Sequence, residues 1–311
     1  QPVGLMPRIK APVVQPPSLR RGDAVAITAP SSALRDDDSL KRGIAVLESW
    51  GLKVQPHQLD ARHWGYLSGT DQQRRADLDQ RPTPPLLACA RGGWGAARLL
   101  EQSWSWSAGW LLGFSDITAL LCSRLAQGVG GGVHGPLVTT LADEPDWSQQ
   151  RLQELLFDRM APDLNGETWV GGKAQGPLLT ANLTVASHLL GSSHLPDMRG
   201  MILVIEDVGE APYRLDRMLT HWRLAGSLQG LAGLGLGRFS GCEDPNLSAS
   251  AEETFSLEQV LKERTVDLGI PVISGLPVGH GPGGNAALPV GVPACLDANR
   301  GILSLALPDQ R

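Results

Sequence analysis

The sequence predicts an α/β protein of two domains, the first of which contains a parallel sheet covered by helices. Three observations support this prediction. In the first half, short apolar runs alternate with segments whose apolar residues recur at helical spacing, a pattern typical of parallel sheets. Near the end of the chain, short apolar runs are separated by glycine and proline, which indicates strands joined by turns. The length of 311 residues exceeds the usual size of one domain.

The first half alternates strand and helix candidates. Buried strands are expected where short apolar runs end in loops, at 24–29, 52–54 and 85–90. Helices are expected at 38–50, 70–78 and 96–101. The second of these helices opens with Thr70 and Gln73 in a capping-box pattern. Functional groups collect at the carboxyl ends of parallel strands, which directs attention to the loops at 30–32, 91–95 and 113–116.

Ser115 lies where an apolar run at 110–112 passes into a helix expected at 117–127. The first N–H groups of a helix are unpaired, so a serine there is placed to act as a nucleophile. The alternative role is that of an N-cap, which this segment alone favours. The G-x-S-x-G pattern is absent because Ile117 stands where its second glycine would, so an α/β-hydrolase fold is not predicted.

Residues 143–175 are expected to connect the two domains. The segment begins with acidic residues and a proline, contains an amphipathic helix at 148–160, and ends in a polar, glycine-rich stretch. This places the first domain at 20–142 and the second at 176–311. Residues 1–19 are rich in proline and are expected to form an extended leader, which we leave out of the fold prediction.

The second half mixes helix and strand candidates. Helical spacing of apolar residues is found at 182–190, 213–225 and 256–268, and the last of these begins with a Ser-x-x-Gln capping pattern. Strands are expected at 201–205 and 231–237, followed by short strands at 272–273, 288–290, 294–296 and 302–307.

Composition and charge exclude several classes of partner. The net charge is −5 and there is no cluster of Lys or Arg, which argues against nucleic acid. No apolar run approaches the roughly 20 residues that span a bilayer, so we expect no membrane association and a cytoplasmic location. The four cysteines are widely spaced without a CxxC pair, so we expect buried thiols rather than a metal site or disulfides.

An acid and a base are candidates in the second half. Glu206 directly follows an apolar strand, where a charged side chain is expected to face a cleft. A cap, or an ion pair with Arg214 or Arg217, explains it equally well. His280 lies in a glycine-rich loop at 279–284, whose backbone freedom can aim an imidazole. With Ser115, the chain order is nucleophile, acid, base, as in hydrolases that use serine.

Two further features bear on this choice. His134 precedes a Gly-Pro pair at an expected strand end, and it stays a second histidine candidate. The loop at 279–284 matches G-x-G-x-x-G, but no helix follows and no acidic residue closes a βαβ unit, so we reject dinucleotide binding.

Several motifs, in the same order along the chain, closely resemble the LD-carboxypeptidase family, the serine peptidases that trim murein tetrapeptides. The resemblance extends from about residue 20 over nearly the whole chain and is carried by the stretches 90–95, 113–118, 206–210, 213–217, 236–239 and 279–281.

The resemblance implies a Rossmann-like α/β N-terminal domain, a smaller mixed α/β C-terminal domain, and a homodimer. It places the nucleophile at Ser115, the acid at Glu206 and the base at His280. The implied reaction releases the terminal D-alanine of murein tetrapeptides through an acyl-enzyme, in peptidoglycan recycling. It implies no metal and no cofactor.

An oxyanion site is expected beside Ser115. The N–H of Asp116 and an N–H from Gly92 or Gly93 would form it, and Arg91 is the candidate substrate contact. One departure from the family affects substrate detail more than reaction type, because Thr180-Ala181 stands where relatives commonly have Gly-Gly.

Two alternatives stay open. Microcin-immunity-type enzymes share the family pattern and cleave amides in peptidyl nucleotides, for which aromatic stacking on a purine is expected. Trp94, Trp104, Trp106 and Trp110 are candidates for such stacking, although core positions are the more usual role. A non-catalytic ligand-binding protein is the other alternative, and the presence of all three catalytic candidates argues against it.

Overall fold

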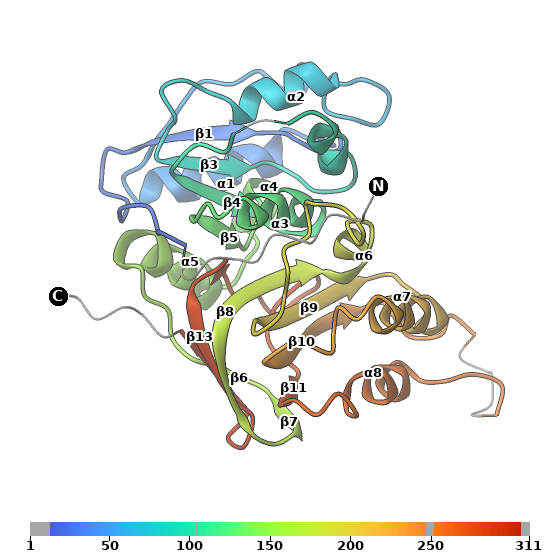
Figure 1. Ribbon diagram of the computed structural model, residues 1–311. Helices are drawn as coiled ribbons and strands as arrows, with labels where there is room; N and C mark the ends of the chain where they lie inside the picture. Colours follow the sequence, from blue (N-terminus) through green and yellow to red (C-terminus); the bar gives the residue numbers. More distant parts are fainter. Residues whose placement is uncertain (1–12, 104, 247–251, 306–311) are drawn as a thin grey trace.

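The computed structural model describes residues 13–103, 105–246 and 252–305, which form two sheets with helices packed around them (Figure 1). The first sheet has the strand order β12-β5-β4-β3-β1-β2 within these residues. Its strands are β12 (Leu288–Pro289), β5 (Gly132–His134), β4 (Trp110–Gly113), β3 (Leu86–Cys89), β1 (Ala24–Thr28) and β2 (Lys53–Val54). All pairs are parallel except β12 with β5, which is antiparallel.

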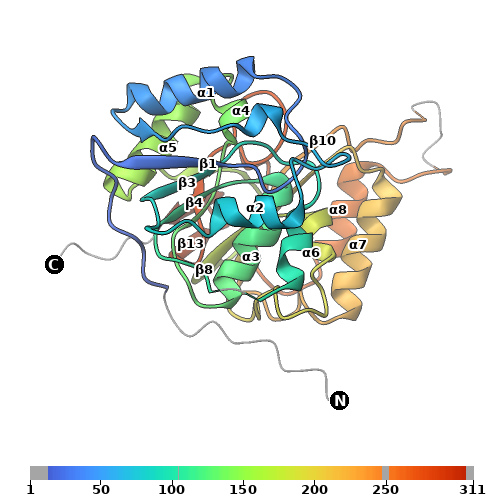
Figure 2. The same ribbon diagram turned by 90° about the horizontal axis from the view of Figure 1, so that it is seen from above.

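Helices cover both faces of the first sheet (Figure 2). On one face lie α1 (Asp38–Ser49), α4 (Val138–Leu141) and α5 (Asp146–Asp158); on the other lie α2 (Asp71–Leu78) and α3 (Thr118–Ala126). The short 3-10 helices are η1 (Leu59–Ala61), η2 (Ala96–Glu101) and η3 (Ser115–Ile117). The strands are buried on both faces because alternate residues pack into different cores: Val25 and Ile27 share a core with α1, whereas Ala26 lies in the core on the side of α2.

The second sheet has the order β6-β14-β13-β8-β9-β10-β11-β7 in the described part of the chain. Its strands are β6 (Leu164–Asn165), β7 (Glu167–Val170), β8 (Lys173–Asn182), β9 (Ile202–Val208), β10 (Gly233–Ser240), β11 (Val272–Ser274), β13 (Pro293–Asp297) and β14 (Ile302–Leu305). The pairs from β8 to β11 are parallel, and the outer pairs are antiparallel.

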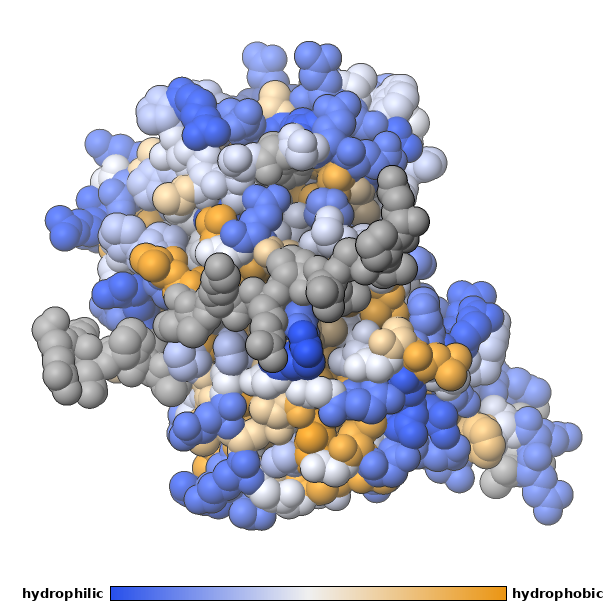
Figure 3. All heavy atoms as spheres, viewed as in Figure 1, coloured by the Kyte–Doolittle hydropathy of each residue, from blue (hydrophilic) through white to orange (hydrophobic). Residues whose placement is uncertain are grey.

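The helices of the second half are α6 (Leu183–Ser187), α7 (Pro212–Leu224) and α8 (Leu257–Thr265). One hydrophobic core joins the two halves, since Leu121 of α3 and Leu203 of β9 belong to the same buried cluster. On the face shown in Figure 3, polar residues dominate over the first sheet and apolar residues gather over the second. Among the described residues, no helix combines the length and apolar character needed to cross a bilayer.

The structure confirms the α/β class and both predicted capping boxes, Thr70 with Gln73 and Ser256 with Gln259. It differs from the predictions in two places. The expected helix at 96–101 is a 3-10 helix. The expected connection at 143–175 contains α5, β6, β7 and the start of β8, three of which are strands of the second sheet. The domain bounds themselves stay a prediction.

The expected leader also contributes to the cores. Val13 and Leu19 are buried, and the carbonyl of Pro17 accepts a hydrogen bond of 2.9 Å from Trp110 Nε1. Residues 1–12 and the end of the strand expected at 302–307 lie outside the described residues. The thiols of Cys89, Cys122 and Cys242 are buried, as predicted, and Cys295 is half-buried.

Candidate active site

Ser115 lies at the turn between β4 and α3, as the first residue of η3. Its φ angle is 62°, an uncommon value for a residue with a side chain. Gly113 permits this tight turn, because a Cβ atom there would lie 2.8 Å from side-chain carbons of Ile117. Ser115 is not the N-cap: Phe114 precedes η3, and no side chain caps that turn. Ile117, which stands where the G-x-S-x-G pattern has its second glycine, therefore fills the space next to Gly113.

The structure brings Ser115, His280 and Glu206 into one hydrogen-bonded chain. His280 Nε2 lies 3.1 Å from Ser115 Oγ, and His280 Nδ1 lies 2.8 Å from Glu206 Oε2. Glu206 is at the carboxyl end of β9, and His280 is in the loop that follows β11. The serine thus comes from the first sheet and the other two residues from the second. The Glu206 side chain is completely buried, whereas 22% of the His280 side-chain surface is exposed to solvent. The imidazole is therefore accessible from one side.

The carboxylate of Glu206 is held inside the second sheet rather than paired with an arginine. Asn182 Nδ2 donates to Glu206 Oε1 at 3.3 Å. A Cβ atom on Gly279 would lie 2.8 Å from Glu206 Oε2, so glycine is needed for this close approach. Arg214, one of the arginines considered as a partner, lies 3.6 Å from Glu210 instead.

The glycine-rich loop that carries His280 is fixed by side chains that sequence reasoning missed. Ser240 Oγ donates to the carbonyl of His280 at 2.6 Å. The N–H of Gly279 donates to Asn285 Oδ1 at 2.9 Å, and the N–H of Asn285 donates to Glu144 Oε2 at 2.8 Å. Ser240 ends β10 and Glu144 precedes α5, so no local sequence signal links either one to His280.

His134, the other histidine candidate, has no hydrogen-bond contact with Ser115. It is fully buried at the end of β5, and neither ring nitrogen has a hydrogen-bond partner among the described residues. Its ring meets Phe114 edge-on at 5.7 Å, and Phe114 in turn lies 4.6 Å from the His280 ring. Burial, with a smaller contribution from the nearby His280, lowers the pKa of His134 to about 3, so the imidazole is neutral.

The glycine-rich turn after β3 lies directly against Ser115. A Cβ atom on Gly92 would lie 3.1 Å from Ser115 Oγ and 3.6 Å from the nitrogen of Asp116. In the described residues, no hydrogen bond uses the N–H of Gly93 or of Asp116. The Asp116 side chain is buried, which raises its pKa, and its Oδ2 accepts hydrogen bonds from Ser31 and Ala96.

Arg91 precedes this turn and is half-buried. Its guanidinium donates to the carbonyl of Ala33 and forms no ion pair with a described residue. Burial lowers its pKa, with a smaller contribution from Arg35. The structure therefore places a cation beside the turn without bringing it into contact with Ser115.

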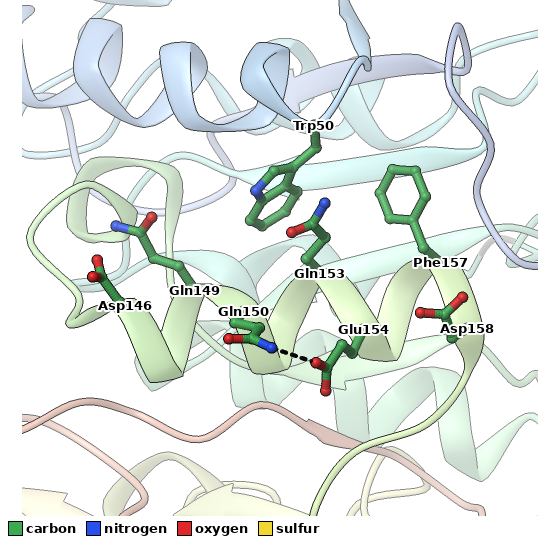
Figure 4. Close-up of a pocket in the computed structure, with 8 residues that line it drawn as sticks. All are labelled: Trp50, Asp146, Gln149, Gln150, Gln153, Glu154, Phe157 and Asp158. Carbon is green, nitrogen blue, oxygen red and sulfur yellow. Dashed lines mark hydrogen bonds between the residues drawn. The ribbon is translucent and has the colours of Figure 1, made fainter.

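The cavity in Figure 4 is separate from this arrangement. It measures about 530 Å³ and is lined by Trp50 and the exposed face of α5. Gln150 Nε2 donates to Glu154 Oε1 at 2.7 Å within it, and none of the predicted site residues reaches it. The described residues hold no group of three or more His, Cys, Asp or Glu side chains arranged to bind a metal ion.

Comparison with known proteins gives consistent matches over both halves. Models of the LD-carboxypeptidase N-terminal and C-terminal domains match residues 25–135 and 175–296. A putative carboxypeptidase of Synechocystis is 47% identical over 298 residues, covering 94% of this chain and 97% of that protein. The murein tetrapeptide carboxypeptidase of Pseudomonas aeruginosa is 34% identical over 307 residues, covering 89% of this chain and 94% of that protein.

Solved structures with similar folds cover nearly the whole chain. The crystal structure of muramoyltetrapeptide carboxypeptidase from Oxalobacter formigenes has a TM-score of 0.78 at 28% identity and covers 91% of this chain and 97% of its own. A mutant of the microcin C7 self-immunity protein, in complex with adenosine monophosphate, has a TM-score of 0.81 at 19% identity, covering 95% of this chain and 99% of its own. At that identity the second likeness shows the fold alone.

Proposed function

Because this chain belongs to the LD-carboxypeptidase family, we propose that it is a serine carboxypeptidase that releases the terminal D-alanine of murein tetrapeptides. The observation that carries the proposal is the hydrogen-bonded chain from Ser115 through His280 to Glu206. Its order and geometry are those in which a serine is activated by a histidine whose orientation a carboxylate fixes.

In the proposed reaction, Nε2 of His280 takes the proton of Ser115 as Oγ attacks the carbonyl carbon of the scissile amide. The tetrahedral intermediate collapses when His280 gives that proton to the amine of D-alanine, which leaves. A water molecule then loses a proton to His280 and attacks the acyl-enzyme. As this second intermediate collapses, His280 returns the proton to Oγ of Ser115, and the shortened peptide is released. Glu206 holds the imidazole by Nδ1 and stabilises its positive charge in both steps.

The oxyanion of each intermediate would be stabilised by the N–H of Asp116 and the N–H of Gly92 or Gly93. The position of Gly92 against Ser115 and the unused N–H groups of Gly93 and Asp116 support this assignment. A well-placed donor contributes about 3 kcal/mol to transition-state stabilisation. For the carboxylate of the terminal D-alanine we propose Arg91, which lacks an acidic partner among the described residues.

The named relatives support the proposed substrate class. The Pseudomonas relative is a murein tetrapeptide carboxypeptidase and the Oxalobacter structure is a muramoyltetrapeptide carboxypeptidase. For this chain we propose the same class of substrate, with a role in peptidoglycan recycling in the cytoplasm and a homodimer as the working form.

The experiment is a mass-spectrometric assay of the purified protein on a murein tetrapeptide that ends in D-alanine. The parent is expected to release one D-alanine, and the Ser115→Ala variant none. Ser49→Ala, which changes an exposed serine of α1, is the matched control and is expected to match the parent. An intact tetrapeptide after treatment with folded parent protein would refute the murein assignment.

One exposed side chain favours a second candidate, hydrolysis of peptidyl- or aminoacyl-nucleotide amides as in microcin-immunity-type enzymes. Trp94 is 43% exposed beside Gly93, where a purine can stack, whereas Trp106 and Trp110 are buried. Trp104 lies outside the described residues. Incubation with an aminoacyl sulfamoyl adenosine distinguishes the candidates, because only an enzyme of the second kind would release the amino acid.

A further inference from the structure

The loop at 30–32, which follows β1, is hydrogen-bonded to Asp116, the residue after Ser115. Ser31 is completely buried, and its hydroxyl donates to Asp116 Oδ2 at 2.6 Å. The same oxygen accepts the N–H of Ala96 at 2.9 Å. One carboxylate oxygen thus joins the loops that follow three strands, β1, β3 and β4.

The same loop also fixes the glycine-rich turn on both sides of Gly93. The N–H of Ser32 donates to the carbonyl of Gly92 at 3.2 Å, and the N–H of Trp94 donates to Ser32 Oγ at 3.0 Å. Gly93 lies between these contacts with a φ of 103°, and a Cβ atom there would lie 2.2 Å from Ser32 Oγ. The direction of the Gly93 N–H is therefore set by the loop at 30–32.

Arg74 holds the loop and the turn together from behind. It is completely buried, and its Nη1 donates to the carbonyls of Pro30 at 2.6 Å and Gly95 at 2.8 Å. Its ion-pair partner is Asp71. Backbone and side-chain contacts thus fix both loops relative to each other, and Asp116 is the point at which the nucleophile turn attaches to them.

We propose that the Asp116 side chain is a positioning residue for the oxyanion site. The side chain accepts hydrogen bonds from Ser31 and Ala96. These bonds keep the backbone N–H of Asp116 and the N–H of Gly92 or Gly93 directed at the same oxygen, the oxyanion of the tetrahedral intermediate. The side chain does this without touching the oxyanion. The proposal rests on the proposed function, since it takes Ser115 as the nucleophile.

A physical need for such an anchor follows from the backbone at Ser115. A residue with a side chain at a φ of 62° relaxes toward negative φ unless its surroundings hold it. Asp116 is the next residue, so fixing its carboxylate restrains the peptide group that carries the oxyanion donor. The two bonds require only an acceptor oxygen at Oδ2, and an amide oxygen supplies one equally well.

The test is the rate at which a serine-directed diphenyl phosphonate labels Ser115. The Ser115 oxygen bonds to phosphorus, phenoxide leaves, and His280 receives the serine proton. The phosphoryl oxygen occupies the oxyanion site, so the rate reports donor alignment without any peptide substrate. Asp116→Ala is expected to label about 100-fold more slowly than the parent, Ser31→Ala about tenfold more slowly, and Asp116→Asn within about threefold of the parent.

Controls separate positioning from stability. Asp36→Ala removes an exposed aspartate that accepts the Ser39 N–H at 2.8 Å, and it should label at the parent rate. Ile44→Ala lowers the melting temperature by trimming a half-buried residue of α1, and its labelling rate well below that temperature should also match the parent. On an active peptide substrate, Asp116→Ala should lower kcat and leave KM within about threefold.

Each outcome decides the matter. Labelling of Asp116→Ala at the parent rate would overturn the proposal, as would an Asp116→Asn variant as slow as Asp116→Ala. If Asp116→Ala does not fold, Ser31→Ala decides in its place, and the parent rate there overturns the proposal. A parent protein that the phosphonate does not label refutes the serine mechanism itself, and the positioning role falls with it.

Discussion

The imidazole Nε2 of His280 lies 3.1 Å from Oγ of Ser115, although 165 positions separate the two residues along the chain. Because the serine follows a strand of the first sheet and the histidine a strand of the second, neither sheet alone contains the site.

Glu206→Gln should lower kcat about 10⁴-fold without loss of fold. An amide does not stabilise an imidazolium and does not fix the tautomer in which Nε2 accepts the serine proton. Steady-state kinetics on the tetrapeptide, with circular dichroism as the fold check, measures this. Glu258→Gln, on the exposed face of α8, is the control and should keep parent activity. A kcat within tenfold of the parent would contradict the assigned role.

Gly92→Ala should lower kcat by at least about 100-fold. The added methyl would lie 3.0 Å from Ser115 Cβ and 3.1 Å from its Oγ, so the nucleophile must move. Gly230→Ala is the matched control, since its methyl would also meet a close atom, Arg199 Cγ at 2.7 Å, but at a place that none of the site residues contacts. Equal kcat values for the two variants would contradict the prediction that a methyl group on Gly92 displaces Ser115.

Ser240→Ala should lower kcat about fivefold and leave KM unchanged. The variant loses the 2.6 Å bond to the His280 carbonyl, and one such bond contributes about 1 kcal/mol to holding the loop. Ser49→Ala, which loses a bond to the Val46 carbonyl on an exposed helix, serves as the control. A change in KM rather than kcat would show that Ser240 acts on substrate binding instead.

The pH dependence of stability should contain a contribution from His134. Burial lowers its folded pKa from 6.5 to about 3, so the unfolded chain binds this proton more readily. The free energy of unfolding therefore falls as pH decreases from about 6.5 toward 3, by about 1.4 kcal/mol per pH unit from this group. Above that window the contribution is complete and constant.

Urea unfolding at pH 7.5, 6 and 5 measures this term. His134→Leu, which keeps the volume but does not titrate, should show a shallower loss of stability between pH 6 and 5 than the parent. Ile44→Ala, which lowers stability without removing a titrating group, should leave the slope unchanged. Parallel slopes for parent and His134→Leu would exclude His134 as the cause.

Features that depend only on neighbouring residues could be predicted from the sequence. The capping boxes at Thr70 and Ser256 predicted helix starts because all their bonds join residues three apart. Ser115, Glu206 and His280 were candidates because each follows an apolar strand, and the family models confirm the resemblance to LD-carboxypeptidases. Their catalytic roles stay predictions.

Contacts between distant segments could not be predicted from local patterns. The strands β6 and β7 have only two and four residues, too few for a clear alternation of apolar and polar residues, and their pairing with β14 and β11 identifies them as strands. The φ of Ser115 has no sequence marker, since Gly113 and Ile117 form the turn in place of a second glycine. Ser31 and Ser240 lie at ordinary strand ends, and only the packed structure shows what their hydroxyls bind.

The antiparallel pairing of β12 with β5 has a consequence for how the chain is made. Leu288 and Pro289 form the border strand of the first sheet, and they follow the His280 loop closely in sequence. On the ribosome, the half with Ser115 emerges long before the segment that completes its sheet, and that same segment carries His280, the proposed base. Under the proposed mechanism we therefore expect a nascent chain to be inactive, and activity to begin only with near-complete synthesis.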